Sequence, residues 1–233
     1  MPHIVITGGS QRLGLALTEH FLAQSWQVSV LSRHSSNELS ALACKHLTVY
    51  TTGDYSLHAI QPVCEQLQQD KVNVLVHNAS LFEPDQADAI KSDNQLQQMM
   101  QVHVQLPAYL NRQLCQIMSQ SSNANIIQMT DIYTINPNEH YANYCASKAA
   151  AANLALSLAK LLAPGIRVNC IAPGALKFLP SHSEQAKQAV LEGALIQHEA
   201  GFDPIIQSID YLIHNSFITG TTLKVDGGRS LCR

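Results

Sequence analysis

Short apolar segments alternate along the chain with longer segments in which apolar positions recur every three or four residues. The short segments are rich in Val, Ile and Leu, as buried parallel strands are, and the longer ones have the period of amphipathic helices. This alternation predicts an α/β fold with a doubly wound, mainly parallel sheet that helices cover on both faces. The expected strands are His3–Thr7, Gln27–Leu31, His46–Thr51, Val72–His77, Asn125–Thr130, Ile166–Ile171 and Thr222–Val225.

Capping and helix-breaking residues predict where the longer helices begin and end. Ser92 and Gln95 have the spacing of a capping box, which predicts a long helix over Asp93–Ser119. Pro107 lies inside that segment and should kink the helix, because proline has no N–H group to donate. A second long helix is expected over Asn143–Leu162, which is rich in Ala and Leu.

The length of 233 residues suits a single α/β domain, and 46% hydrophobic residues suffice for a continuous core. Between Gly174 and Gly201 the helix and strand pattern weakens, so residues 175–200 are expected to form a mobile loop over a substrate. Asp203 and Pro204 then predict the N-cap and first helical position of a late helix that ends near His214.

Composition and charge argue against several classes of protein. The net charge is −3 with scattered Lys and Arg, so no nucleic-acid partner is expected. The six cysteines form no C-x-x-C pair, which is typical of reduced thiols in a cytoplasmic protein. The sequence contains no H-E-x-x-H motif, so no metal site is expected. The pattern enters a strand at His3 and contains no apolar run of about 18 residues, so neither a signal peptide nor a membrane segment is expected.

A glycine-rich turn follows the first predicted strand. Gly8, Gly9 and Gly14 lie between this strand and the next helix, where glycines let the backbone approach a pyrophosphate at the helix N-terminus. A strand–helix turn without a ligand could also use glycines at these positions. The turn alone therefore indicates a nucleotide site without establishing it.

The end of the second predicted strand indicates which nucleotide is bound. Ser32-Arg33-His34 contains no acidic side chain that could accept hydrogen bonds from a ribose diol. Arg33, together with Arg12 in the glycine turn, instead offers positive charge to a 2′-phosphate. The alternative is that both arginines are solubilising surface residues. The pattern favours NADPH over NADH.

Tyr144 and Lys148 are four residues apart on a predicted helix and therefore share one of its faces. A nearby ammonium group stabilises a phenolate, so Lys148 is expected to lower the pKa of Tyr144 toward the range useful for acid–base catalysis. Asp131, thirteen residues before the tyrosine, either takes part in this acid–base catalysis or is a structural residue that begins a turn. With the glycine turn, these residues predict a nucleotide-dependent reductase.

The order and spacing of these motifs resemble the short-chain dehydrogenase/reductase family over nearly the whole chain. The matching segments are Thr7-Gly8-Gly9…Gly14, Asn78-Ala79-Ser80, Tyr144…Lys148, Pro173-Gly174, Phe217-Ile218-Thr219-Gly220 and Val225-Asp226-Gly227-Gly228. Arg12 directly before Leu13-Gly14, and Asp131 in the place of the usual catalytic serine, are similar to the pteridine reductases of this family.

The resemblance implies a role for each matching residue. Tyr144, Lys148 and Asp131 would be catalytic. The residues implied to contact the cofactor are Gly8, Ser10, Arg12, Leu13, Ser32, Arg33, Asp54, Asn78, Ala79, Tyr144, Lys148, Pro173 and Gly174. Those implied to contact the substrate are Ser80, Phe82, Asp131 and Tyr144, with Phe82 stacking on a pterin ring and Asp54 contacting the adenine of the cofactor.

The implied activity is the NADPH-dependent reduction of the N5=C6 bond of a 7,8-dihydropterin by a homotetramer. Asp131 would donate the proton, or Tyr144 with the help of Lys148. His103 stands where many family members have the asparagine of a proton relay, but a helix histidine is more often structural, so it is left outside the catalytic set.

Two other functions fit parts of the pattern. A carbonyl or 3-oxoacyl-thioester reductase of the same family would favour serine at the position of Asp131. A non-catalytic NADP(H)-binding sensor would lack Tyr144 or Lys148, and both are present.

Overall fold

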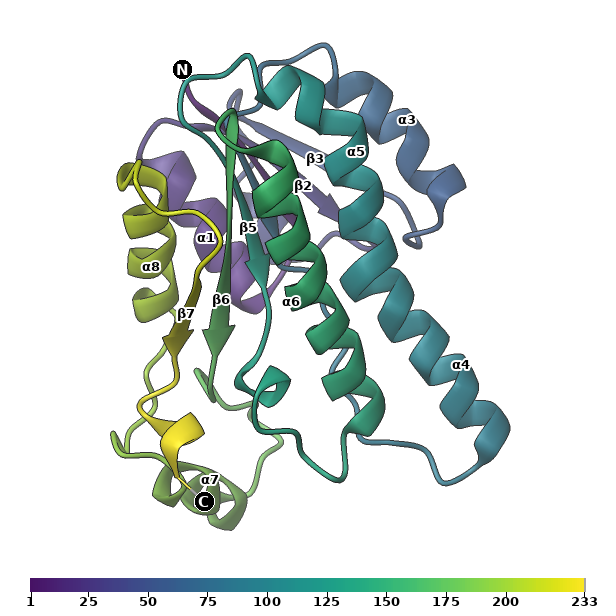
Figure 1. Cartoon of the computed structure of the whole chain (residues 1–233), viewed down its shortest axis with the longest axis vertical. Coiled ribbons are helices and arrows are strands. Elements are labelled where there is room, and N and C mark those ends of the chain that lie inside the picture. The colour runs from purple at the N-terminus through teal and green to yellow at the C-terminus, as the bar shows by residue number, and fades with distance from the viewer. Residues whose placement is uncertain (233) are drawn as a thin grey trace.

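The computed structural model of the protein describes residues 1–232 and has the predicted doubly wound α/β fold (Figure 1). Seven parallel strands form one sheet in the order β3-β2-β1-β4-β5-β6-β7. The strands are β1 His3–Thr7, β2 Gln27–Ser32, β3 Leu47–Thr51, β4 Val74–His77, β5 Ala124–Met129, β6 Ile166–Pro173 and β7 Thr222–Val225. Every predicted strand is present, with its ends shifted by two residues at most.

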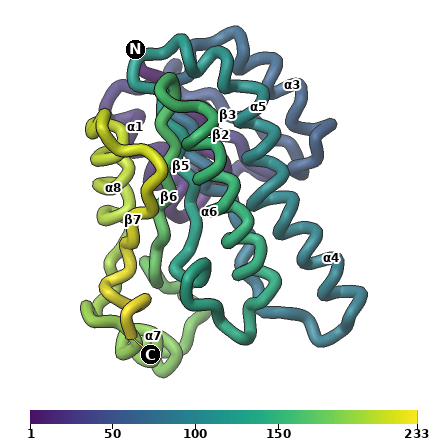
Figure 2. Tube along the Cα trace, viewed as in Figure 1, coloured from purple at the N-terminus to yellow at the C-terminus, as the bar shows by residue number. Residues whose placement is uncertain are grey.

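Helices cover both faces of this sheet (Figures 1 and 2). One face packs against α1 (Arg12–Ala23), α2 (Asn37–Ala41) and α8 (Asp203–His214). The other packs against α3 (Leu57–Leu67), α5 (Leu106–Met118) and α6 (Ala142–Leu162). Successive strand residues point to opposite faces, so each buried strand contributes to both apolar layers.

The predicted helix over Asp93–Ser119 is interrupted, and its predicted start is wrong. Helix α4 (Ala89–Met100) begins one turn earlier, because the Asp88 carboxylate accepts a hydrogen bond from the Lys91 N–H at 2.9 Å and caps it. The Ser92–Gln95 capping box therefore does not form. A π-helical turn, Gln101–Gln105, joins α4 to α5, and this wider turn accommodates Pro107 near the start of α5.

Helices α6 and α8 begin within one residue of their predicted starts. Asp203 is the first residue of α8, and Phe202 is the N-cap, which corrects the predicted capping role of Asp203. The segment 175–200 contains α7 (Glu184–Glu192), none of whose residues is buried in the described chain. Its mobility stays a prediction. Among residues 1–232, no helix is both long and apolar enough to cross a bilayer.

The order of the strands creates the place for a ligand. The chain runs outward from β1 to β3 and then returns to place β4 on the other side of β1. Connections leave β1 and β4 in opposite directions, so a crevice opens where these two strands end. The loops after β1, β2 and β4 meet at this crevice.

Candidate active site

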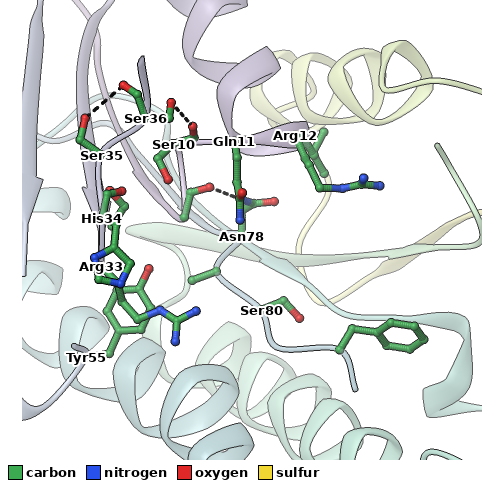
Figure 3. Close-up of a pocket in the computed structure, with 16 residues that line it drawn as sticks. Ser10, Gln11, Arg12, Arg33, His34, Ser35, Ser36, Tyr55, Asn78 and Ser80 are labelled. Atoms are coloured by element: carbon green, nitrogen blue, oxygen red, sulfur yellow. Dashed lines mark hydrogen bonds between the residues drawn. The ribbon is translucent and has the colours of Figure 1, made fainter. Parts of the chain in front are cut away.

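A groove of about 400 Å³ lies at the carboxyl ends of β1, β2 and β4 (Figure 3). It contains most of the residues that the sequence predicted for cofactor or substrate binding. Those that line it are Gly8, Ser10, Arg12, Leu13, Ser32, Arg33, Asn78, Ala79, Ser80 and Phe82. Gln11, Ser35, Ser36 and Tyr55 also line it, although no sequence motif singled them out.

The glycine turn has the shape of a phosphate cradle. Gly8 has a φ of +69°, and a Cβ there would lie 2.8 Å from the Cα of Ala79. A Cβ at Gly14 would lie 2.0 Å from the Gly8 carbonyl oxygen. The N-cap of α1, Gln11, makes no side-chain capping bond within residues 1–232, and the first turn contains no acidic residue. The backbone N–H groups of the first turn of α1 are therefore available to bind an anion.

Asn78 holds the two central strand ends together. Its side-chain amide donates to the carbonyl oxygens of Thr7 and Gly8, at 3.2 and 3.1 Å. The Thr7 hydroxyl oxygen accepts in turn from the backbone N–H groups of Asn78 and Ala79, both at 3.0 Å. The floor of the groove is thus fixed before any ligand binds.

The structure does not bring the two predicted phosphate-binding arginines together. Arg33 lies with its guanidinium 5.8 Å from the centroid of the Tyr55 ring, at the end of β2. Arg12 points toward the other end of the groove (Figure 3), where it donates to the Lys177 carbonyl oxygen and lies 5.9 Å from the Phe202 ring centroid. Arg33 alone remains at the β2 end, where the 2′-phosphate was expected.

Five residues predicted to contact the cofactor lie outside the groove lining, namely Asp54, Pro173, Gly174, Tyr144 and Lys148. The Asp54 carboxylate is solvent-exposed and accepts a 2.7 Å hydrogen bond from the Ser56 N–H. Hydrogen bonding by the Ser56 side chain, followed by that of the Ser56 N–H, lowers the pKa of Asp54. Pro173 ends β6, and Gly174 packs so closely on Asp226 that a Cβ at Gly174 would lie 2.9 Å from the Asp226 Cα.

Tyr144, Lys148 and Asp131 meet as the sequence predicted. The Tyr144 hydroxyl donates to the Asp131 carboxylate at 2.9 Å, and the other carboxylate oxygen accepts from the Tyr133 N–H at 2.9 Å. Lys148 donates to the Met129 carbonyl oxygen at 3.0 Å, and its Nζ lies 5.6 Å from the Tyr144 ring centroid. Tyr144 and Lys148 are almost fully buried, so their charges are poorly solvated.

This geometry corrects the prediction that Lys148 lowers the pKa of Tyr144. Burial, followed by the nearby Asp131 carboxylate, raises the Tyr144 pKa well above the usual value for a phenol. The Lys148 ammonium gives its hydrogen bond to the backbone and not to the phenol, and burial lowers the Lys148 pKa to about 8. Burial also raises the pKa of Asp131, against the opposing effects of its hydrogen bonds and of Lys148. Tyr144 therefore stays protonated at neutral pH, and Asp131 takes up a proton more readily than an exposed carboxyl.

His103 orients Ser80 beside this group. The Leu81 N–H donates to His103 Nε2 at 3.1 Å, so the imidazole proton lies on Nδ1 and is donated to the Ser147 hydroxyl at 2.8 Å. The Ser80 hydroxyl donates to the same Nε2 at 2.9 Å. Burial and Lys148 lower the pKa of His103 well below that of a free imidazole, so it stays neutral. The sequence drew attention to His103 but did not reveal these partners.

An aromatic wall closes the substrate end of the groove. The Phe82 ring stacks on Tyr141, with centroids 4.6 Å apart and planes 5° from parallel, and meets Tyr144 edge-on at 4.8 Å. Phe82 is nevertheless 55% exposed, so part of its ring is open to a flat ligand. Tyr141, at the N-cap position of α6, is the ring that supports Phe82 from its other face.

Known proteins resemble this chain in sequence and in structure. The family model described as short chain dehydrogenase matches residues 2–189. A dihydromonapterin reductase of Enterobacter sp. (strain 638) is 32% identical over 232 residues, covering 98% of this chain and 96% of that protein.

Two solved structures share the fold. FolM alternative dihydrofolate reductase 1 from Brucella canis, complexed with NADP, has a TM-score of 0.90 at 24% identity and covers 100% of this chain and 95% of that one. 4-Hydroxyisoleucine dehydrogenase complexed with NADH has a TM-score of 0.90 at 23% identity and covers 100% of both chains. At these identities the two structures are evidence for the fold and not for a substrate.

Proposed function

Because the chain belongs to the short-chain dehydrogenase family, we propose that it uses NADPH to reduce a 7,8-dihydropterin, with dihydromonapterin as its substrate. The observation that carries the proposal is the Asp131 carboxylate, bonded to the Tyr144 hydroxyl beside the exposed ring of Phe82. An acid suits the protonation of a ring nitrogen, and an exposed aromatic ring suits a flat heterocycle. The dihydromonapterin reductase relative, 32% identical over nearly the whole chain, supports the same substrate.

The groove fits the cofactor that this reaction needs. The cradle formed by Gly8 and Gly14, and the free N–H groups of the first turn of α1, would hold the pyrophosphate. Arg33 would hold the 2′-phosphate, and no acidic residue at the end of β2 opposes it. NADPH, when bound, supplies the hydride that C6 of the pterin accepts.

The side chains of the protein supply the one proton that the reaction needs. Reduction of the N5=C6 bond adds a hydride to C6 and a proton to N5, so N5 needs an acid within reach. Asp131, whose pKa is raised by burial, carries the proton to N5. The Tyr144 hydroxyl donates to the carboxylate that remains, and Lys148 places a positive charge nearby. A serine could not replace this acid, since its hydroxyl mainly polarises a carbonyl.

Selectivity for NADPH is expected to depend on Arg33. Arg33→Ala should raise the KM for NADPH about tenfold to a hundredfold, the cost of one lost charge-assisted hydrogen bond. The KM for NADH should stay nearly unchanged, since NADH has no 2′-phosphate. Initial rates with both cofactors test this, with Arg112→Ala as the control because Arg112 is exposed on α5. Equal losses with both cofactors would assign Arg33 a structural role.

Recognition of the pterin is expected to depend on Phe82. Phe82→Ala removes about 0.5–1.5 kcal/mol of stacking in addition to the buried area, so the KM for dihydromonapterin should rise about tenfold. Small aliphatic carbonyls, which do not stack, should be barely affected. Phe217→Ala is the matched control, since Phe217 is fully exposed after α8. An unchanged KM for dihydromonapterin in Phe82→Ala would contradict the pterin assignment.

A further inference from the structure

Helix α6, which carries Tyr144 and Lys148, does not cap its own N-terminus. Tyr141 occupies the N-cap position, and its side chain makes no capping hydrogen bond within the described chain. The first N–H groups of a helix have no partner inside the helix and are costly to leave unsatisfied. The start of α6 therefore needs an acceptor from elsewhere.

Asp85 supplies that acceptor from the loop between β4 and α4, residues 78–88. One carboxylate oxygen accepts from the Ala142 N–H at 2.7 Å, and the other accepts from the Asn143 N–H at 3.1 Å. The backbone N–H of Asp85 also donates to the His140 carbonyl oxygen at 2.9 Å. A carboxylate at this position complements the positive end of the helix dipole as well. Three hydrogen bonds thus clamp the 78–88 loop to the start of α6.

A buried glutamine holds the same two segments together from α4. Gln95 donates its side-chain amide to the Pro84 carbonyl oxygen at 2.9 Å. Its side-chain oxygen accepts from the Asn143 side chain at 3.2 Å. The residue before Asp85 and the second residue of α6 therefore share one partner. The loop has no route to move away from the helix without breaking both sets of bonds.

The clamp fixes the aromatic wall of the site. Phe82 lies three residues before Asp85 and stacks on Tyr141, directly before the N–H groups that Asp85 caps. The same helix turn carries Tyr144, which Phe82 meets edge-on at 4.8 Å. The distance between Phe82 and Tyr144 is thus set by the bonds that join their two segments. Asp85 makes the most direct of these bonds.

We propose that Asp85 is a positioning residue, which holds the Phe82 ring at the spacing from Tyr144 that a flat heterocyclic substrate requires. The identity of that substrate rests on the proposed function; the clamp itself does not. The bonds of Asp131 to Tyr133 and of Lys148 to Met129 do not pass through Asp85. Asp85 should therefore control the KM for the heterocycle much more than kcat or the affinity for NADPH.

The experiment compares Asp85→Ala with Asp88→Ala in the whole 233-residue chain. Asp88 is the matched control, since it is an aspartate of the same loop that caps α4 through the Lys91 N–H and makes no side-chain hydrogen bond to α6 within residues 1–232. Asp85→Ala should raise the KM for dihydromonapterin roughly fivefold to tenfold, because the free energy lost with a helix cap corresponds to an affinity change of that size. Asp88→Ala should leave that KM unchanged, and Asp85→Asn, which keeps one acceptor oxygen, should recover part of the loss. Equal KM changes in Asp85→Ala and Asp88→Ala would overturn the proposal.

A double-mutant cycle separates positioning from general damage. If Asp85 acts through Phe82, Asp85→Ala should raise the KM little in a protein that already carries Phe82→Ala. Fully additive increases in KM would show that Asp85 does not act through the ring and would overturn the proposal.

Amide hydrogen exchange tests the clamp without any substrate. Asp85→Ala should speed exchange in residues 80–85 and 140–145, and Asp88→Ala should not speed it in residues 140–145. Unchanged exchange at 140–145 in Asp85→Ala would overturn the clamp. If the wild type failed to reduce dihydromonapterin while exchange changed as expected, the proposed function would fail and the clamp would stand.

Discussion

Tyr144→Phe should leave the fold intact and lower kcat on dihydromonapterin by about 10²–10³, the range for removal of a hydrogen-bond donor that stabilises charge formed in the reaction. The substitution removes only the hydroxyl that donates to Asp131 and keeps the ring that packs against Phe82 and His103. The rate of NADPH oxidation at saturating substrate measures kcat. A melting temperature close to that of the wild type would show that the fold is intact.

Tyr133→Phe provides the matched control for this loss. The Tyr133 hydroxyl accepts a hydrogen bond from the Asn138 side chain at 3.2 Å, and it is the backbone N–H of Tyr133 that donates to Asp131. Loss of the Tyr133 hydroxyl should therefore leave kcat near the wild-type value. Wild-type turnover in Tyr144→Phe would remove Tyr144 from the mechanism.

Asp131→Asn should lower kcat on dihydropterins by a similar factor of about 10²–10⁴ while NADPH still binds normally. The amide oxygen can accept one of the two hydrogen bonds that the carboxylate accepts, but the amide cannot supply a proton. Fluorescence titration with NADPH would check cofactor affinity separately from turnover. The sharper substitution is Asp131→Ser, and a serine variant that reduced carbonyls well without any loss on dihydropterins would contradict the role of Asp131.

The pH profile of Asp131→Asn provides a second test. A general acid works only in its protonated form, so wild-type kcat should fall as the pH rises through the pKa of Asp131. Burial raises that pKa, so the fall should begin at higher pH than an ordinary carboxyl would give. The asparagine variant should lack this dependence. An identical profile in both proteins would assign the titration to another group.

The features that the sequence predicted well depend on local patterns. Alternating apolar strands and helices can be recognised from neighbouring residues, so the parallel sheet follows from the sequence. The contact between Tyr144 and Asp131 was also within reach, because the end of a strand and the start of the following helix bring the two together. The resemblance to a known family then supplied roles for both residues.

The features that could not be predicted from the sequence depend on which hydrogen-bond partner a side chain has in the folded protein. The Tyr144 pKa was predicted with the wrong sign, because the sequence gives the spacing of Lys148 but not its hydrogen bond to Met129. Arg12 was expected beside Arg33, yet it bonds Lys177 in a segment far along the chain. The cap that Asp85 gives to α6 links residues 57 positions apart, which no local pattern reveals.

The most direct test of the central claim is NADPH oxidation by the wild-type protein with dihydromonapterin and, separately, with an acetoacetyl thioester. We expect kcat/KM for dihydromonapterin to exceed kcat/KM for the thioester by about 100-fold or more, because the Asp131 carboxyl and the Phe82 ring both favour the heterocycle. Faster reduction of the thioester, or no oxidation of NADPH with dihydromonapterin, would contradict it.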